Sequence, residues 1–534
     1  MLVGTMCAST MALTGCLEET FPTSGATAGQ LASSSKATEA LLWEMPAFLN
    51  NLATYSKDYA YDWGYGSIMH MRDVMTADMA VVPSGYNWYT SWSSNTYLGN
   101  RYVAPYFPWS FYYKGIQTAN NLIGAVDETK ANDDQKGYLG VAHTFRALYY
   151  LEAAQLYEFL PSDVYSDGLS DAGKKIENLT VPVVTESTTE TQARNNPRAT
   201  RDSMLHFIVG ELDKAEKQIP YLTETSKTLP HLACVYGLKA RAYMWVAQYD
   251  SAYVYAMKAI NQKDKLNSFG ITTKEDWLST TNGFNDLSCK SWMWGAQTAK
   301  EDEVVQTGIL NWTSWMSNET SYGYSAAGPY LMIGSDLYNK IDNNDFRKLS
   351  FKAPATNPLS GSEPYIDESL FASLPTYASL KFRPGSGDTG EPTVGSVSAY
   401  PLMRYEEMYF IAAEAAARMN QVSTAKTLLT AVMSVRNPSY NCKASSAEDM
   451  AEEIFLQKRI EFYGEGITFF DYKRLNKSVD RTTSENWDAS ENFKTEGRPA
   501  WMVWSIPYAE GSQNAAIKDY MNPDPSGLYT PVTK

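Results

Sequence analysis

The sequence predicts a mostly helical fold in which helical hairpins form a scaffold that carries long irregular loops and a few short strands. Three observations predict it. Apolar residues recur at steps of three and four in several segments. These segments come in pairs with short breaks between them, and long stretches rich in Gly, Pro, Asn and Ser separate the paired blocks. Of the 534 residues, 44% are hydrophobic and 20% are charged, which excludes a disordered chain.

The amino terminus has the pattern of an export signal. Residues 1–15 contain an apolar stretch that ends in Leu13-Thr14-Gly15, and Cys16 follows directly. An apolar region followed by small residues is typical of a signal peptide. A cysteine at this point resembles the bacterial lipobox, which implies lipid attachment at Cys16. The alternative is an ordinary signal peptide with a chance cysteine, and the segment lacks the Lys or Arg that usually precedes the apolar region.

A tether and one large body are expected after the signal. Residues 16–35 are rich in Thr, Ser, Gly and Ala, which is typical of a flexible segment. Residues 36–534 are predicted to form a single body, with its helical scaffold mainly in 110–261 and 400–475. Within 204–219, for example, Leu205, Ile208 and Leu212 fall on one helix face. Further helices are predicted over 111–126, 135–159, 235–249, 250–261, 405–419, 425–435, 447–463 and 467–473.

The pairing of these helices favours tetratricopeptide-like hairpins, whose unit is about 34 residues. No full repeat consensus is present. A coiled coil is disfavoured because no heptad pattern continues beyond one helix.

Long irregular stretches are predicted mainly over 55–108 and 262–397, and long loops in compact proteins usually carry function. Within the second stretch, Ser291–Gly295 alternates like a strand. Because side chains two apart in a strand share a face, Trp292 and Trp294 are expected to pack together in the core.

Several segments, taken together, resemble the SusD/RagB family of surface nutrient-binding lipoproteins from Bacteroidetes. The lipobox at Cys16 fits the family, and residues 139–157 (LGVAHTFRALYYLEAAQLY) are similar to its long helix. Residues 454–474 (IFLQKRIEFYGEGITFFDYKR) resemble its Arg-x-Glu-aromatic…Glu-Gly…Phe-Phe-Asp-x-x-Arg stretch, and 505–510 (SIPYAE) resemble its Ile-Pro-x-x-Glu. Each match is weak alone, but their order along the chain makes the set specific.

The resemblance implies a lipid-anchored protein of the outer membrane that faces the cell exterior. Such a protein captures an oligosaccharide or polysaccharide and hands it to a SusC-like TonB-dependent transporter. Five arginines lie within the family-like helices, and we expect them to be buried partners of carboxylates, because a buried charge must be paired. They are Arg146, Arg241, Arg404, Arg459 and Arg474, with Glu414, Glu461, Glu465 and Asp471 as the expected partners.

The content of aromatic residues is high, at 13%, with 37 Tyr and 14 Trp. The flat C–H faces of sugar rings pack on Trp and Tyr, which lose little entropy on binding because they are stiff. Two loop stretches, 74–92 and 311–324, combine such aromatics with Asn and Ser. The predicted glycan contacts are Asn87, Trp88, Tyr89, Trp92, Trp312, Trp315, Tyr322 and Tyr324. The alternative for Trp88 and Trp92 is that, four residues apart, they lie on one face of a short helix that packs in the core.

No catalytic, metal or cofactor motif is recognisable. The four His are isolated, and the chain has no HExxH, P-loop or GxSxG sequence. The net charge of −15 disfavours nucleic acid as a partner. Two other functions stay open: a helical glycoside hydrolase or lyase, which needs only two suitably spaced carboxylates, and a repeat scaffold that binds only proteins.

Overall fold

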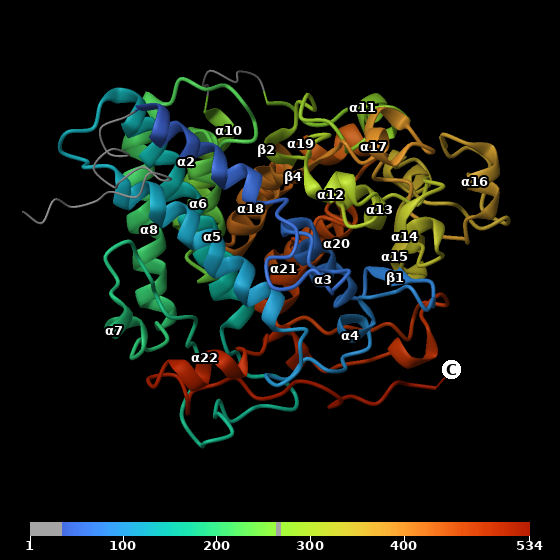
Figure 1. Ribbon diagram of the computed structural model, residues 1–534. Helices are drawn as coiled ribbons and strands as arrows, with labels where there is room; N and C mark the ends of the chain where they lie inside the picture. Colours follow the sequence, from blue (N-terminus) through green and yellow to red (C-terminus); the bar gives the residue numbers. More distant parts are fainter. Residues whose placement is uncertain (1–34, 263–268, 534) are drawn as a thin grey trace, which may run out of the picture.

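Helices dominate the part of the chain that the structure describes, residues 35–262 and 269–533, in a computed structural model (Figure 1). The mostly helical fold predicted from the sequence is therefore confirmed. The expected signal peptide and Cys16 lie outside the described residues. The longer helices are α2 (Ser35–Phe48), α3 (Tyr65–Val74), α5 (Tyr106–Ala125), α6 (Asp133–Tyr157), α8 (Arg201–Gln218), α9 (Leu232–Trp245), α10 (Tyr249–Asn261), α18 (Tyr405–Arg418), α19 (Val422–Arg436), α20 (Ala447–Glu461) and α21 (Thr468–Arg474).

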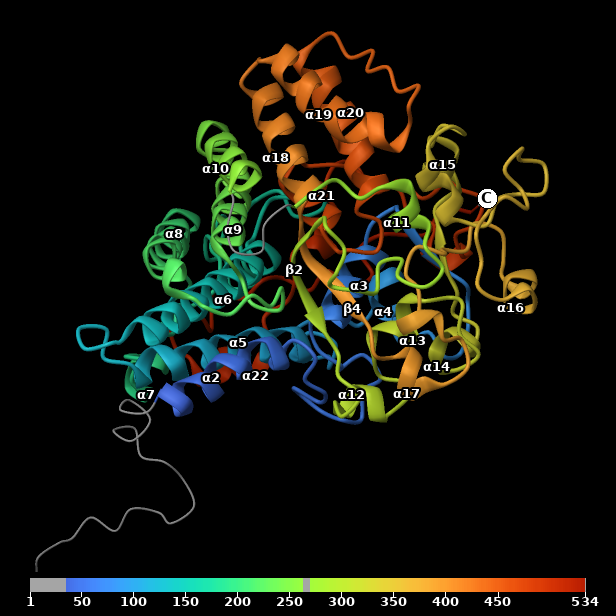
Figure 2. The same ribbon diagram turned by 90° about the horizontal axis from the view of Figure 1, so that it is seen from above.

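These helices pack on one another in a continuous series. Helices α2 and α5 pack on α6, α6 packs on α8, α9 packs on α10, and α10 packs on α18, which also contacts α19 and α20. Seen from above in Figure 2, the series forms an arc on one side of the molecule, and the loop-rich part occupies the other side. The packing of consecutive helices on one another agrees with the paired amphipathic segments of the sequence.

Helix α6 is the centre of the scaffold, and its sequence explains its start. Asn132 caps it through its side chain, and Gln135 completes a capping box, with two acidic residues in the first turn. Almost every later residue of α6 is buried, because neighbouring helices cover it on several sides.

The loop-rich part contains two small antiparallel ladders. Strand β1 (Met79–Val81) pairs with β3 (Leu331–Ile333), and β2 (Trp292–Gln297) pairs with β4 (Ala399–Arg404). Trp292 and Trp294 are buried in β2, which confirms the strand predicted there. The same part also holds α4 (Thr90–Ser93), which contains Trp92 and agrees with the alternative of a short helix there. Its other short helices were not predicted: α11 (Lys274–Leu278), α12 (Glu303–Gln306), α13 (Trp312–Met316), α14 (Gly323–Ala326), α15 (Ser335–Asn339), α16 (Glu368–Ser373) and α17 (Pro392–Gly395). Two more, α7 (Glu190–Ala193) and α22 (Tyr508–Gln513), lie near the scaffold in Figure 1.

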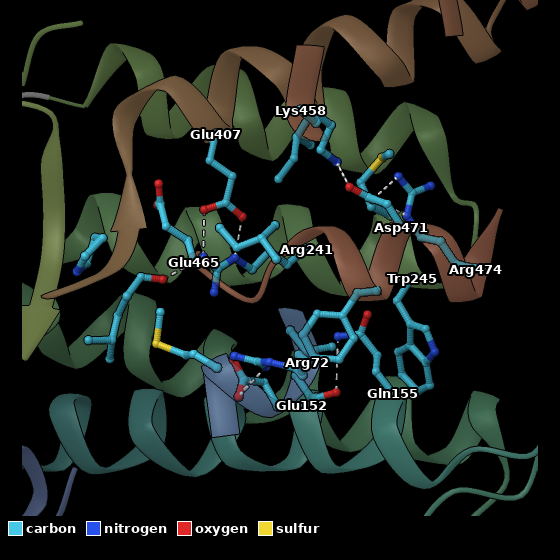
Figure 3. Close-up of a pocket in the computed structure, with 18 of the residues that line it drawn as sticks. Arg72, Glu152, Gln155, Arg241, Trp245, Glu407, Lys458, Glu465, Asp471 and Arg474 are labelled. Atoms are coloured by element: carbon cyan, nitrogen blue, oxygen red, sulfur yellow. Dashed lines mark hydrogen bonds and ion pairs between the residues drawn. The ribbon is translucent and has the colours of Figure 1, made fainter. Parts of the chain in front are cut away.

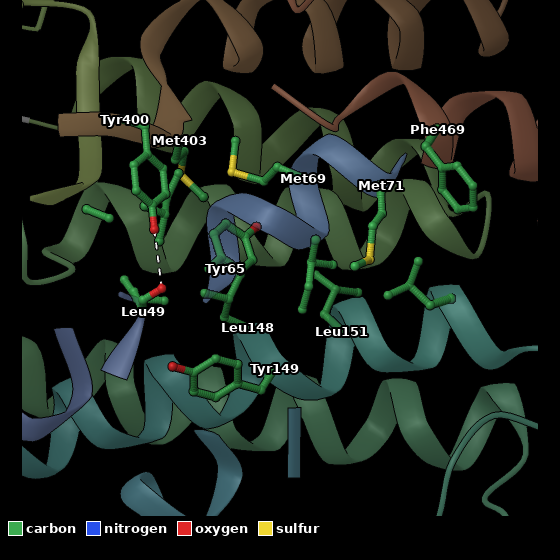
Figure 4. Packing of buried hydrophobic residues seen from close by; sticks show 14 of the residues in the cluster. Leu49, Tyr65, Met69, Met71, Leu148, Tyr149, Leu151, Tyr400, Met403 and Phe469 are labelled. Carbon is green, nitrogen blue, oxygen red and sulfur yellow. Dashed lines mark hydrogen bonds between the residues drawn. The ribbon is translucent and has the colours of Figure 1, made fainter. Parts of the chain in front are cut away.

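The core joins the scaffold to the loop-rich part. Figure 4 shows Leu148 and Leu151 of α6 facing Met69 and Met71 of α3, with Tyr400 from β4 at one end. The Tyr400 hydroxyl donates a hydrogen bond to the Leu49 carbonyl at 3.3 Å. All ten residues of α3 are buried. One hydrophobic core therefore spans the helical scaffold and the loop-rich part, and the loops pack against this core.

All five arginines predicted to be buried ion-pair partners do pair with carboxylates. Arg404 contacts Glu461 and Glu465, and Arg474 contacts Glu414 and Asp471. The other three have partners that the sequence did not identify: Arg146 contacts Glu211, Arg241 contacts Glu407, and Arg459 contacts Asp78.

Two further facts concern the cysteines and the membrane. Cys234, Cys289 and Cys442 are free thiols. Among the described residues, none of the helices is both long enough and apolar enough to cross a bilayer.

Candidate functional site

The pairing of β1 with β3 brings the two aromatic loop stretches together. Val81 pairs with Leu331, and the Val82 amide donates to the Tyr330 carbonyl at 2.9 Å. The Ser84 hydroxyl donates to the Ala327 carbonyl at 3.2 Å. The segment that leaves β1 therefore lies beside the segment that enters β3, although they are about 240 residues apart in sequence. The two predicted walls of the site are neighbours.

The outer layer of this region consists of Tyr86, Trp88 and Tyr324, which we call the aromatic face. Tyr86 is 58% exposed and Trp88 is 46% exposed. Tyr324 is half-buried, its hydroxyl is hydrogen-bonded to the Trp88 side chain, and burial raises its pKa. Trp88 and Tyr324 are therefore neighbours, and Tyr86, two residues before Trp88 in the same turn, is the most exposed of the three.

A buried aromatic layer supports the aromatic face. Trp315 stacks under Tyr324 with ring centroids 4.1 Å apart and an interplanar angle of 17°. Tyr89 meets Trp315 edge-on at 4.8 Å and His70 at 4.3 Å. Burial lowers the pKa of His70 to about 3, so this ring is neutral at physiological pH. Tyr324 is therefore held on a buried, uncharged support, which reduces the entropy lost when a ligand packs on it.

Four of the eight predicted glycan contacts are buried in this structure, so they do not belong to its exposed surface. Tyr89 and Trp315 belong to the supporting layer described above. Trp92 lies on α4 and packs edge-on against Tyr61 at 5.0 Å. Trp312 stacks on Tyr400 at 4.6 Å. Each of these side chains is at most 3% exposed, because it fills space between the loops and the core.

The side chains of the other four predicted contacts are at least partly exposed to solvent. Trp88 and Tyr324 belong to the aromatic face. The Asn87 side-chain oxygen accepts a hydrogen bond from the Tyr89 amide at 3.1 Å, which fixes the turn that presents Trp88. Tyr322 is partly buried against the loop that contains Ser396. The sequence reasoning missed Tyr86, for which the neighbouring turn residues Ser84 and Gly85 were an available signal.

Replacing Tyr89 by Phe should destabilise the supporting layer, although the aromatic ring and its packing are kept. The Tyr89 hydroxyl accepts a hydrogen bond from the Trp63 indole at 2.8 Å, and it also bonds the Ser67 hydroxyl at 2.7 Å. Tyr89→Phe leaves the buried Trp63 N–H unpaired, so we expect the free energy of unfolding to fall by about 1–3 kcal/mol. Urea denaturation would measure this, and an unchanged midpoint would contradict the role of this hydrogen bond.

A separate cavity lies within the scaffold, between α3, α6, α9, α18, α20 and α21 (Figure 3). Ion pairs line it: Arg72 lies 3.2 Å from Glu152, and Arg241 lies 2.6 Å from Glu407. Its volume of about 60 Å³ is enough for a few water molecules. Ligand pockets usually exceed about 300 Å³. This cavity is therefore too small for a sugar ring, and its charged residues pair with one another between neighbouring helices.

Two family models match the chain. The one described as "Starch-binding associating with outer membrane" matches residues 31–244, and the one described as "SusD family" matches residues 288–524. Together these matches span most of the chain. A curated relative, SusD-like protein P38 of Formosa agariphila, is 21% identical over 440 residues, which make up 75% of this chain and 76% of the relative.

Solved structures share the fold. A SusD-like carbohydrate binding protein from Bacteroides vulgatus superposes with a TM-score of 0.70 at 20% identity, over 91% of this chain and 98% of that one. A laminarin binding SusD-like protein superposes with a TM-score of 0.62 at 16% identity, over 91% of this chain and 99% of that one.

Proposed function

The chain belongs to the SusD/RagB family, and on that premise we propose that it binds a glycan at the cell surface and delivers it to a TonB-dependent transporter. The family description that matches residues 31–244 names starch binding and the outer membrane, which supports a polysaccharide ligand and an outer-membrane location. The structural likeness to a laminarin binding protein also supports a glycan ligand. The lipid anchor at Cys16, the exterior location and the SusC-like partner rest on the sequence resemblance.

The exposure of the aromatic face is the observation that carries the proposed binding site. Sugar rings pack their C–H faces on Trp and Tyr. Trp88 and Tyr86 are the exposed contacts that we propose, and Tyr324 lies beside them. Asn87 and Tyr322 are proposed as flanking polar contacts that can hydrogen-bond sugar hydroxyls.

A glycoside hydrolase or lyase is the second candidate, and the contacts of the adjacent carboxylates disfavour it. Glu406 binds Arg436, and Glu407 binds Arg241. Glu452 binds Lys477, and Glu453 accepts a hydrogen bond from Tyr440 at 2.7 Å. Carboxylates that are held by cations or hydroxyls within the fold are poorly placed to protonate a glycosidic oxygen. We therefore propose binding without catalysis.

Native gels that contain single polysaccharides, such as starch or laminarin, test the proposed function. We expect at least one polysaccharide to retard the full chain. Because Tyr86 is the most exposed ring of the aromatic face, we expect Tyr86→Ala to reduce the shift by several-fold in apparent affinity. Tyr221→Ala is the matched control, since Tyr221 is 42% exposed on a different part of the surface.

Two results of this experiment would contradict the proposal. If no polysaccharide in a broad panel retards the chain while the transporter is still captured in a pull-down, the protein-binding scaffold is favoured. If reducing ends are released from the polysaccharide, the hydrolase is favoured.

A further inference from the structure

A second pocket, of about 350 Å³, adjoins the small cavity of Figure 3. The two share Gln155, Trp245, Phe470 and Arg474, three of which are labelled at one end of that figure. The pocket lies where α6 and α9 end, beside α21 and the segment 158–178. Its volume falls within the range of sites for small ligands.

Positive charge predominates in the lining of this pocket. Its cations are Arg201, Lys473, Arg474 and Arg498, and its carboxylates are Glu158 and Glu177. Arg474 is already neutralised, because it lies 2.6 Å from both Glu414 and Asp471. Glu177 is exposed to solvent. The whole chain has a net charge of −15, so this cluster of cations differs from the overall acidity of the protein.

Two of these cations are held only by uncharged oxygen atoms. The buried Lys473 amino group donates to the carbonyls of Gln155 and Leu156, at 2.6 and 2.9 Å. The Arg498 guanidinium donates to the Lys473 carbonyl at 2.6 Å and to the Asn476 side-chain oxygen at 3.1 Å. Within the described ranges, no carboxylate lies in an ion pair with either group. A buried cation without a counter-charge is costly.

Glu158 is the one buried carboxylate of the lining, and both of its oxygens are occupied. One binds Arg201, and the other accepts a hydrogen bond from the Trp245 indole at 2.9 Å. Burial lowers the pKa of Lys473 well below its usual value. Glu158 opposes this effect, whereas the nearby Arg498 and Arg201 add to it. Glu158 is thus fully engaged by Arg201 and Trp245, and neither Lys473 nor Arg498 forms an ion pair with a carboxylate of the lining.

We propose that this pocket binds a small ligand through an oxyanion group: a sulfate, a phosphate or a carboxylate. Such a group would supply the counter-charge that Arg498 lacks, and it would favour the charged form of Lys473, which burial and the neighbouring arginines oppose. The planar guanidinium groups of Arg498 and Arg201 match the geometry of oxyanions. The anion can come from a free inorganic ion or from an acidic sugar. The site is separate from the aromatic face and does not depend on the proposed function.

Calorimetric titration of the full chain at constant ionic strength tests the proposal, with sodium sulfate, sodium glucuronate and glucose as the probes. We expect saturable binding of at least one anion and none of glucose at this pocket. Arg498→Gln removes one charged hydrogen-bond donor, so it should weaken anion binding by about tenfold. Arg194→Gln is the control, since Arg194 is exposed and pairs with Glu190 on α7. Tighter binding of glucuronate than of sulfate identifies an acidic sugar as the source, and the reverse order identifies an inorganic ion.

A second variant keeps the test decisive if Arg498→Gln fails to fold. Ala247 lines the pocket at an exposed position with a φ of 60°, a conformation that Asp tolerates. Ala247→Asp adds a negative charge at the rim and should also weaken anion binding. The proposal is overturned if neither anion binds, or if the folded pocket variants bind anions as tightly as Arg194→Gln does.

Discussion

Replacing Glu461 by Gln is expected to lower the free energy of unfolding by about 3–5 kcal/mol. Glu461 is fully buried and lies 3.0 Å from Arg347, 3.0 Å from Arg404 and 2.8 Å from Arg436. These arginines come from different segments of the chain, so this carboxylate of α20 ties together α19, strand β4 and the segment Phe346–Ser350. Its removal leaves three buried guanidinium groups with less negative charge around them. Urea denaturation at pH 7 measures the loss.

The effect of this substitution should depend on pH. Burial raises the pKa of Glu461, but Arg436, Arg404 and Arg347 outweigh burial and hold the pKa well below its ordinary value of 4.5. A carboxylate whose pKa is depressed in the folded state stabilises the fold fully above its unfolded pKa, and this stabilisation is lost as the pH falls through the folded value. The stability difference between wild type and E461Q should therefore be largest at neutral pH and shrink below about pH 4.5.

Glu452→Gln is the matched control for E461Q. Glu452 is about half exposed and pairs with Lys477 at the surface. Surface ion pairs contribute little, so we expect a change within about 0.5 kcal/mol. Equal stabilities of E461Q and E452Q would contradict the assigned role of the buried cluster.

Replacing Trp88 by Ala should weaken glycan binding by about tenfold or more while the fold stays intact. Trp88 is the exposed indole of the aromatic face, and truncation removes the flat surface on which a sugar ring would pack. Because nearly half of the side chain faces solvent, its removal leaves no large cavity. Titration with the polysaccharide that retards the wild-type chain measures the affinity.

Trp43→Ala is the control for this substitution. Trp43 is 36% exposed and lies on α2, within the helical scaffold. Its loss should leave the affinity unchanged. If both variants bind as wild type does, the aromatic face is not the glycan site.

The helical scaffold could be predicted because it is encoded locally. The apolar steps at Leu205, Ile208 and Leu212 place them on the buried face of α8, and all three are buried. The pairing of Arg404 and Arg474 with carboxylates could also be predicted, because a buried arginine must have an acidic partner.

The geometry of the candidate site could be predicted only in part, because it depends on contacts between distant segments. Strands β1 and β3 have three residues each, too few for a period of two to be recognised in the sequence. The sequence does not show whether a Trp of these two stretches faces solvent, as Trp88 does, or the core, as Trp315 does. That depends on whether residues of the other stretch cover it in the folded chain. For Trp92, the alternative of a short buried helix is the correct one.

The second pocket, of about 350 Å³, could not be predicted from the sequence either, because it too depends on contacts between distant segments. Arg201, Lys473 and Arg498 come from three separate segments, and none of them belongs to a basic run. Their proximity, and the occupation of Glu158 by other partners, exist only in the folded chain.

A crystal structure of the full chain with an oligosaccharide from the polysaccharide that retards it would test the central claim most directly. The account predicts a sugar ring packed on Trp88, with Tyr86 and Tyr324 beside the bound chain. A sugar bound elsewhere on the molecule, with the aromatic face empty, would contradict it.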